Sequence, residues 1–405
     1  MTLAWQREHS GGTRVSSLHD APAVDEVFCR SLATHWQGDF SAKTRLLVIC
    51  SHHDATLDIS FLRPFAGDKG KASGNTAVVV LDENALSSLY AQTAPASDHL
   101  GLAPILACFN PTHVVICRYW GARSADIKAE LRQLNIPVIT FLDDDLFHVP
   151  VEAGQNVFAF FNDPDRRRTL QMWVEEADLL LVSTPQLAKS LKRLRKTRPM
   201  EVCEIYRSVT DEEFALIPGL SEDEDVIGYM GSQSHADDLD LWVPSLVSLM
   251  QERPTLRFET FGTIPMPIAL KAFGDRVHAR GKAASYDEFI NTLRMTQWSL
   301  GLAPLAETAF NANKACTKWV EYTLAGIPTL ASPGPVYASA ISRQACAATE
   351  TDTVKSAITR LLDNPDARAS LLSSAVKELK NNYKVVQHQR FLLKVLKSAS
   401  RKSST

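Results

Sequence analysis

Residues 298–333 read WSLGLAPLAETAFNANKACTKWVEYTLAGIPTLASP, and this stretch decides the fold. Residues 298–303 form a short apolar run that ends before a proline, which is typical of a buried strand in a parallel sheet. Apolar side chains then recur every four residues along the second half of the stretch, a spacing that predicts a helix with one buried face. Gly326 suits the C-terminal cap of that helix, and residues 327–332 return as a second strand. The stretch therefore predicts a strand, a loop, a helix and a strand of an α/β sheet.

Three charged residues lie on the other face of the predicted helix, because Lys314, Lys318 and Glu321 are spaced i, i+4 and i+7. In open α/β sheets, ligands bind beyond the carboxyl ends of the strands, where a helix N-terminus offers unpaired N–H groups. Two lysines there, with a carboxylate deeper in the helix, could hold a diphosphate and a sugar hydroxyl. The same spacing also fits an ordinary exposed ion pair between Lys318 and Glu321. We expect Asn311 or Asn313 to cap the helix.

The size and charge of the chain limit what it can be. A chain of 405 residues is too long for one ordinary domain, so we expect two or three. Its hydrophobic content of 45% and charged content of 22% are those of a soluble globular protein. The formal net charge is −3, so there is no overall electrostatic attraction to nucleic acid, and we expect no nucleic-acid partner.

The cysteines and the apolar segments suggest a compartment. The seven cysteines contain no C-x-x-C pair, which favours reduced thiols over a zinc site or a disulfide framework. The first fourteen residues, MTLAWQREHSGGTR, lack the apolar core of a signal peptide, and no 18-residue apolar run occurs. We therefore expect a cytoplasmic protein.

Short β-branched runs alternate with helical segments along two parts of the chain, which is the pattern of parallel sheets covered by helices. Between the two parts lies a turn-rich acidic segment, PGLSEDED, which suits a linker. We divide the chain into an N-terminal extension (1–40), an N-terminal Rossmann-like domain (41–215), a linker (216–225), a C-terminal Rossmann-like domain (226–380) and a terminal helix or tail that packs back on the N-terminal domain (381–405).

Residues 321–332, EYTLAGIPTLAS, resemble the C-terminal half of GT-B glycosyltransferases, and most closely the retaining enzymes of glycosyltransferase family 4. In that family a Glu, seven residues and a second Glu precede a Gly-x-Pro run. Glu321 matches the second Glu, whereas Asn313 stands at the position of the first. Glu307 lies fourteen residues upstream and could take the first role only through a longer loop.

The resemblance implies an α/β protein of the GT-B class, in which two Rossmann-like parallel-sheet domains face each other across a cleft. It also implies metal-independent transfer of a sugar, with retention, from a nucleotide diphosphate sugar to an acceptor hydroxyl, without a cofactor. Glu321 would bind ribose or sugar hydroxyls of the donor. Lys314 and Lys318 would stabilise the leaving diphosphate, where negative charge develops.

Donor contacts are also expected after the first strand of the C-terminal domain, in the segment GYMGSQSHADD. Relatives carry a Gly-rich turn there, followed by an Arg and a Lys. Here Gly231 and Ser232 supply the turn, and His235 stands where the basic residues are missing. His235 could equally be a helix N-cap or a surface imidazole. The other expected donor-binding residues are Asn311, Asn313 and Glu307.

An acidic triplet, residues 143–145, follows a predicted strand of the N-terminal domain. D-x-D triplets bind metal in another glycosyltransferase architecture, but neighbouring side chains at a strand end point apart, so we expect no metal site. Asp143 is instead expected to line the cleft. His52, His53 and Arg118 follow other strands and could contact the acceptor or the transferred sugar, although a solvated histidine pair and a surface arginine fit equally well.

Cationic segments at residues 166–168, 189–198 and 394–402 could rest on an anionic inner membrane, which would suit a lipid-linked or other glycan acceptor, although charge runs are more often solvated. The predicted function is therefore glycosyl transfer in glycan or surface polysaccharide synthesis by a cytoplasmic enzyme that could associate with the membrane. Two alternatives stay open: a non-catalytic partner protein that keeps the fold, and a nucleotide-sugar epimerase.

Overall fold

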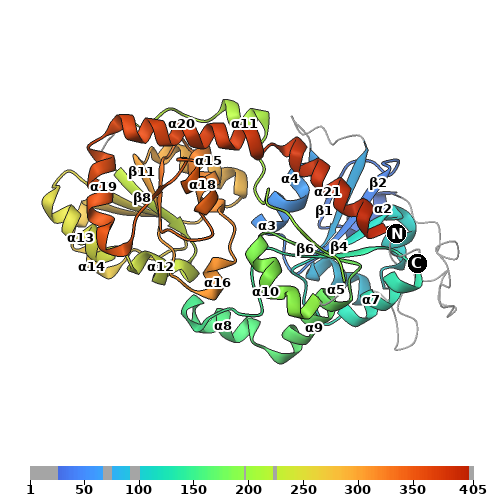
Figure 1. Cartoon of the computed structure of the whole chain (residues 1–405). Coiled ribbons are helices and arrows are strands. Elements are labelled where there is room, and N and C mark those ends of the chain that lie inside the picture. Colours follow the sequence, from blue (N-terminus) through green and yellow to red (C-terminus); the bar gives the residue numbers. More distant parts are fainter. Residues whose placement is uncertain (1–25, 67–74, 92–100, 196–197, 222–225, 401–405) are drawn as a thin grey trace.

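The structure is a computed structural model and describes residues 26–66, 75–91, 101–195, 198–221 and 226–400. Two sheets form its centre, and helices cover both faces of each (Figure 1). The first has seven strands in the order β1-β3-β2-β4-β5-β6-β7, and the second has six in the order β10-β9-β8-β11-β12-β13. All described pairings are parallel except that of β1 with β3. This arrangement confirms the predicted two-sheet α/β fold.

The N-terminal sheet is built from apolar runs that are buried on both faces, as expected for parallel strands. Alternate residues of these strands enter two separate hydrophobic cores, one on each face of the sheet. Its strands are β1 His35–Gln37, β2 Thr44–Cys50, β3 Thr76–Leu81, β4 His113–Cys117, β5 Val138–Leu142, β6 Leu179–Val182 and β7 Met200–Val202. The helices of this part are α2 Glu26–Leu32, α3 Ala55–Leu57, η2 Asp58–Leu62, α4 Arg63–Ala66, α5 Glu83–Ala91, α6 Ala103–Phe109, α7 Ser124–Gln133, η4 Val151–Ala153, α8 Gln155–Phe161, α9 Pro164–Glu176, α10 Pro185–Arg195 and α11 Asp211–Ala215.

The C-terminal sheet is narrower and again separates two cores. Its strands are β8 Val226–Gly231, β9 Arg257–Gly262, β10 Val277–Arg280, β11 Leu300–Ala303, β12 Thr329–Ala331 and β13 Ala347–Ala348. The helices are η5 Gln233–His235, α12 Ala236–Asp240, α13 Val243–Glu252, α14 Ile268–Lys271, η6 Gly274–Arg276, α15 Tyr286–Thr296, α16 Ala309–Ala312, α17 Thr317–Leu324, α18 Ala338–Ser342, η7 Thr351–Thr353, α19 Val354–Leu362, α20 Pro365–Asn382 and α21 Val385–Ser400.

Two glycines on adjacent strands make room for the residues that hold α17. Gly301 of β11 pairs with Gly228 of β8. A Cβ at Gly228 would lie 2.0 Å from the ring of Trp298, and one at Gly301 would lie 2.9 Å from the ring of Tyr322. Any larger residue would therefore push these rings out of the core.

The chain passes twice between the two sheets, and the two crossing segments are hydrogen-bonded to each other. The N–H of Val209 donates to the carbonyl of Tyr383 (2.6 Å), and the N–H of Val385 donates to the carbonyl of Val209 (3.0 Å). After the second crossing α21 lies against the N-terminal sheet (Figure 1), where Leu392 and Leu396 are buried in the core shared with β2 and β5. The C-terminal helix thus covers part of the first sheet.

Some local expectations differ from the structure. Within the extension expected over residues 1–40, the helix α2 ends at Leu32, and residues 35–37 add the antiparallel edge strand β1. The N-cap of α17 is Cys316, without a side-chain cap bond, so the predicted capping by Asn311 or Asn313 is wrong. The reason is a short helix that was not predicted, α16, which has Thr308 as its N-cap and contains Asn311. Residues 1–25 and 222–225 of the predicted extension and linker lie outside the described residues.

The prediction that all seven cysteines are reduced thiols is wrong for two of them. Cys29 of α2 and Cys108 of α6 form a disulfide. They are 79 residues apart, so their spacing offers no recognisable motif, and only the packing of the two helices brings them together. The other five cysteines are free. Within the described part of the chain, no helix has both the length and the apolar character needed to cross a bilayer.

Candidate donor-binding and catalytic cleft

A cavity of about 210 Å³ lies between residues that follow the strands of both sheets. From the N-terminal half it is lined by residues after β5 and around α3, and from the C-terminal half by η5 and the start of α17. Its polar and charged lining residues are Thr56, Asp143, Asp144, Tyr206, His235, Tyr286, Lys314, Thr317, Lys318, Glu321 and Tyr337. The cavity therefore occupies the place where α/β proteins bind ligands, at the carboxyl ends of parallel strands.

Helix α17 is locked in place by its apolar face. Trp319 and Leu324 are buried in the core beneath the sheet. The hydroxyl of Tyr322 donates to the carbonyl of Leu302 (2.9 Å) and accepts from the N–H of Met230 (3.1 Å), so it ties the helix to β11 and β8. With that face buried, the remaining face presents Lys318 and Glu321 to the cavity.

Glu321 is held at the end of a hydrogen-bonded chain of buried side chains. Its Oε1 accepts from the hydroxyl of Tyr286 (2.8 Å), which in turn accepts from Nε of Arg207 (2.7 Å). The guanidinium of Arg207 also pairs with Glu213 (2.6 Å), and Arg63 contacts the same carboxylate. Burial raises the pKa of Glu321, although Tyr286 and the charge of Arg207 oppose this. The carboxylate is thus fixed in position before any ligand arrives.

Lys314 and Lys318 have no carboxylate partner. Neither ammonium forms an ion pair or a hydrogen bond with another described residue, so the alternative of a Lys318–Glu321 ion pair does not apply. Each lies instead over an aromatic ring, at 4.7 Å from the centroid of Phe310 and 5.5 Å from that of Tyr229. Burial and the neighbouring charge of Lys314 lower the pKa of Lys318 to about 8. Two cations that form no ion pair with a described residue therefore face one cavity, which favours an anionic ligand.

His235 lies beside these lysines and is held by Asp238, its Nδ1 being 2.8 Å from Oδ2 of the carboxylate. The charge of Lys318 and burial lower the pKa of His235, so the imidazole is neutral at pH 7. Asp238 also accepts hydrogen bonds from the N–H of Ala306 (2.9 Å) and from the side-chain amide of Asn311 (3.0 Å). Asn311 is therefore buried as a support of this loop and does not line the cavity.

Three other residues predicted to bind the donor lie outside the cavity lining. Ser232 is exposed, and its hydroxyl is 2.7 Å from that of Ser234. Glu307 is also exposed. Gly231 ends β8, and a Cβ there would meet its nearest atom at 3.4 Å, so the fold does not require glycine at this position.

Asn313 joins the two halves of the molecule. Its side-chain amide donates to Oδ2 of Asp145 (2.9 Å), and its carbonyl accepts from the hydroxyl of Thr184 (2.8 Å). It is buried, and its side-chain amide is hydrogen-bonded to the other half of the protein. The residue that stands in place of the first family Glu is therefore an interdomain contact in this structure.

On the N-terminal side of the cavity, Asp143 is the centre of a hydrogen-bonded cluster. Its Oδ2 accepts from Thr56 (2.7 Å) and from Tyr206 (2.8 Å), and Arg118 lies 3.4 Å away. Its Oδ1 is buried and has no hydrogen-bond partner among the described residues. Arg118 also donates to Thr56 (3.0 Å), so its guanidinium is engaged within the protein.

His52 and His53 are exposed and do not line the cavity. Nε2 of His53 lies 2.7 Å from a carboxylate oxygen of Asp58. This local ion pair agrees with a solvated histidine pair better than with an acceptor contact.

Sequence reasoning missed several residues of the cavity. Asp144 was not among the predicted site residues, although it lines the cavity and its carboxylate forms no hydrogen bond or ion pair with any described residue. Thr56, Tyr206 and Tyr286 belong to no motif and come from segments far from the quoted stretch, so nothing in their local sequence marks them. Among the described residues, no three His, Cys, Asp or Glu side chains are grouped as metal ligands.

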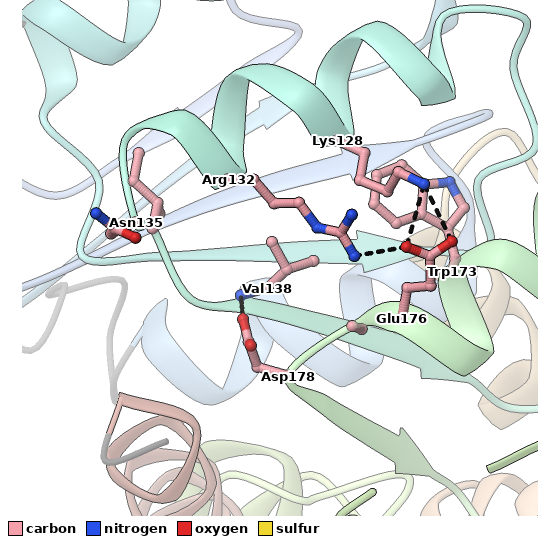
Figure 2. Close-up of a pocket in the computed structure, with 9 residues that line it drawn as sticks. Lys128, Arg132, Asn135, Val138, Trp173, Glu176 and Asp178 are labelled. Atoms are coloured by element: carbon pink, nitrogen blue, oxygen red, sulfur yellow. Dashed lines mark hydrogen bonds and ion pairs between the residues drawn. The ribbon is translucent and has the colours of Figure 1, made fainter. Parts of the chain in front are cut away.

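A second groove, of about 180 Å³, lies at the opposite edge of the N-terminal sheet, where β5 and β6 begin. Figure 2 shows that Lys128 and Arg132 of α7 both reach Glu176, with Lys128 3.0 Å from its carboxylate. Asp178 accepts from the N–H of Val138 (2.8 Å). The charged side chains of this groove all have a partner within the protein, in contrast to Lys314 and Lys318 of the cleft.

The cationic segments are only partly free. Arg195 is buried and donates to the carbonyls of Val174 (2.7 Å) and Pro199 (3.0 Å). Arg167 donates to the carbonyl of Phe147 (2.9 Å). Lys394 of α21 is exposed. Several arginines therefore support loop and helix ends, which reduces the charge available for a membrane surface.

Comparison with known proteins agrees with this geometry. Residues 244–394 match the model of a family described as glycosyl transferase-like. No curated protein matches the chain. Among solved structures, sucrose-phosphate synthase from Thermosynechococcus elongatus is similar with a TM-score of 0.59 and 13% identity over 87% of this chain and 98% of that one. HepE from Anabaena, solved with UDP-glucose, gives 0.60 and 14% over 87% and 99%. Trehalose-6-phosphate synthase OtsA gives 0.55 and 13% over 87% and 99%.

These findings define the class of the protein as a GT-B fold that carries a glycosyl transferase-like domain in its C-terminal half. The predicted GT-B fold is thereby confirmed.

Proposed function

We propose that this protein transfers a sugar from a nucleotide diphosphate sugar to an acceptor hydroxyl, with retention and without a metal ion. The observation that carries the proposal is the pair of lysines, Lys314 and Lys318, which face the interdomain cavity and form no ion pair with a carboxylate among the described residues. A diphosphate would neutralise both. Negative charge grows on the diphosphate as the glycosidic bond breaks, so these cations would lower the barrier to transfer.

The rest of the donor would lie along α17. Glu321, held by Tyr286, offers a preoriented carboxylate for ribose or sugar hydroxyls. Neutral His235 offers a further hydrogen bond beside the diphosphate. Gly231, Ser232 and Glu307 would contact the donor only if it extends beyond the cavity. The UDP-glucose bound by HepE makes a uridine nucleotide the first donor to test. A glycan or lipid-linked acceptor, surface polysaccharide synthesis, a cytoplasmic location and peripheral membrane contact stay part of this proposal.

The proposal is tested with UDP-, GDP- and ADP-glucose, by measuring thermal stabilisation and the release of nucleoside diphosphate. We expect one of the three nucleotide sugars to stabilise the protein against thermal unfolding and to be converted with release of its nucleoside diphosphate. Lys318→Ala and Glu321→Ala should each lower turnover by about 100-fold or more while the protein stays folded. Normal turnover in both variants would remove the site assignment. Lys128→Ala, at the opposite groove, controls for the loss of a half-buried lysine.

A second candidate function is a non-catalytic partner protein that binds a nucleotide. The observation that favours it is Asn313, which replaces the first family Glu and is used between the two halves of the chain. Stabilisation by a nucleotide without release of sugar from any of the three donors would support this second function. An epimerase would instead form a new sugar without an acceptor, which product analysis of the same reactions would reveal.

A further inference from the structure

Tyr286 lies where the two halves of the molecule meet. It is the first residue of α15, in the C-terminal half, yet its ring packs against a hydrophobic core of the N-terminal sheet. Its hydroxyl donates to Oε1 of Glu321 (2.8 Å), and Oε2 of that carboxylate has no hydrogen bond to any described residue. The tyrosine therefore holds one oxygen of Glu321 and leaves the other for a ligand in the cavity.

Arg63 of α4 reaches Tyr286 from the N-terminal half. Its guanidinium carbon lies 5.6 Å from the centroid of the tyrosine ring. Its Nη1 is 2.7 Å from Oδ1 of Asp287, the next residue of α15, and its Nη2 is 2.5 Å from Oε1 of Glu213. Arg63 thus ties the first turn of α15 to the N-terminal half, although it does not itself line the cavity.

Arg207 completes the attachment of the tyrosine. Its Nε donates to the hydroxyl of Tyr286 (2.7 Å), and its guanidinium carbon lies 5.2 Å from the ring centroid. Because the phenol hydroxyl has one proton, accepting from Arg207 leaves that proton to be donated to Glu321. Arg207 and Arg63 also share Oε1 of Glu213. The direction of the hydrogen bond to Glu321 is therefore set by the arginines around the ring.

We propose that Arg63 is a positioning residue for donor binding, which acts through Tyr286 to hold the carboxylate of Glu321 in place. The proposal rests on the proposed glycosyltransferase function, in which Glu321 binds hydroxyl groups of the donor. Without Arg63 the first turn of α15 loses its attachment to the N-terminal half, and the tyrosine hydroxyl can shift. A carboxylate whose support shifts binds a hydroxyl less tightly. A residue of the N-terminal half thereby determines how tightly the C-terminal half holds the donor.

The test measures the dissociation constant of UDP-glucose by titration calorimetry, or of GDP- or ADP-glucose if the donor panel selects one of these. The proteins are the wild type, Arg63→Met, Tyr286→Phe and the double variant. We expect each single variant to raise the dissociation constant by about 10-fold. Because both changes break the same chain of contacts, the double variant should match Tyr286→Phe within about 2-fold. A rise of about 100-fold, the product of two independent effects, would overturn the action of Arg63 through Tyr286.

Two variants remove similar contacts outside the cavity lining and serve as controls. Arg253 pairs with Asp363, and its side chain is 25% exposed, against 19% for Arg63. Tyr90 is buried and donates to Glu130 (2.8 Å). Arg253→Met and Tyr90→Phe should keep the dissociation constant within about 2-fold of the wild-type value.

A purely structural role of Arg63 would give a different result. Partial unfolding lowers the fraction of protein that binds, and so the measured stoichiometry, but leaves the dissociation constant of the folded fraction unchanged. If Arg63→Met does not fold, Arg63→Lys keeps a positive charge beside Glu213 but lacks the planar fork that reaches Asp287 as well. We expect it to raise the dissociation constant by at least about 3-fold.

Two failures can be told apart. If the wild type binds a nucleotide sugar and the folded Arg63 variant binds it equally well, the positioning role of Arg63 is overturned and the proposed function stands. If the wild type binds none of the three nucleotide sugars, the proposed function itself fails, and the role of Arg63 fails with it.

Discussion

The side-chain amide of Asn313 donates a 2.9 Å hydrogen bond to the carboxylate of Asp145, and this contact joins the two halves of the molecule. Asp145 is 1% exposed and is also contacted by Ser190 and His148. A carboxylate at residue 313, as the family pattern would have, would face a buried carboxylate. The structure thus gives a physical reason for an amide at this position.

Replacing Asn313 by Asp tests that reason. The new carboxylate would repel Asp145 and remove a hydrogen bond to a charged group, so we expect a loss of about 2 kcal/mol in the free energy of unfolding. Urea denaturation measures the change. Asn156→Asp, at an exposed position of α8, should change the same quantity by less than about 0.5 kcal/mol. Equal stability of the two variants would contradict the interdomain role of Asn313.

Arg207 should be among the most costly residues to replace. It is 1% exposed and holds both Glu213 and Tyr286. Arg207→Met would leave Glu213 paired with Arg63 only, and we expect it to lower the free energy of unfolding by about 3 kcal/mol. An exposed arginine of α9, Arg168, offers the control variant Arg168→Met. A change of less than about 1 kcal/mol in Arg207→Met would show that the buried network does not stabilise the fold.

The same network predicts a pH dependence of stability. Burial opposes ionisation of Glu213, but Arg207 and Arg63 overcome this and lower its pKa to about 2. A carboxyl group whose pKa is depressed in the folded state stabilises the protein above its unfolded pKa of about 4.5, and this contribution is lost as the pH falls towards about 2. We therefore expect a steep loss of stability between pH 4.5 and about 2 in the wild type. Glu213→Gln should show a shallower slope in unfolding experiments over that interval.

Nucleotide binding should be coupled to protonation of Lys318. Burial and Lys314 lower its pKa to about 8, so roughly half of these side chains are neutral at pH 8. A bound diphosphate would raise the pKa again, and we expect uptake of about half a proton per UDP bound at pH 8. Titration calorimetry in buffers with different ionisation enthalpies measures this number. Lys318→Met should bind with almost no proton uptake, and unchanged uptake in that variant would assign the proton to another group.

We expect the ionised side chain of Glu321 to lower the stability of the folded protein, although turnover requires it. Because burial raises its pKa, the ionised carboxylate destabilises the folded state once the pH exceeds its unfolded pKa of about 4.5. Glu321→Gln should therefore raise the unfolding midpoint at pH 7 by about 2 °C, and the gain should disappear near pH 4. Turnover should fall in the same variant. A lower midpoint at pH 7 would mean that the Tyr286 hydrogen bond stabilises the fold more than burial of the charge destabilises it.

The disulfide between Cys29 and Cys108 can be tested by counting the reactive thiols of the denatured protein. Denatured protein that was never reduced should show five reactive thiols, and reduced protein should show seven. Because the bond closes a segment of 79 residues, its removal in Cys29→Ser should lower the free energy of unfolding by an amount on the order of 4 kcal/mol or less. Seven thiols without reduction would instead restore the prediction of fully reduced cysteines.

Local sequence patterns were sufficient for most of the fold. The apolar runs at residues 46–50, 77–81 and 113–117 became β2, β3 and β4 with ends shifted by no more than two residues. Periodicity works here because strands buried on both faces must be apolar throughout. It failed for the turn α16 and the strand β1, which are short and depend on neighbours rather than on their own pattern.

The candidate site was only half predictable. Lys314, Lys318, Glu321 and His235 line the cavity as expected, although Lys314 precedes α17, which begins at Thr317, and so does not share the predicted helix with Lys318 and Glu321. The hydrogen bonds that keep Asn311 and Asn313 out of the cavity lining could not be predicted from the sequence. Their partners Asp238 and Asp145 are 73 and 168 residues away. A side chain with a distant polar partner looks the same in sequence as one that is free to bind a ligand.

By itself, the sequence determined the α/β class, the presence of two sheets and the helix that carries Lys318 and Glu321, because these follow from the spacing of apolar residues along the chain. Only the tertiary structure decided which charges are already neutralised. It showed that Asp143 and Arg118 form an ion pair, whereas the side chains of Lys314, Lys318 and Asp144 form none with the described residues. The reason is physical: a charge is free or paired according to the atoms around it in space, and those atoms come from segments that the chain brings together only when it folds.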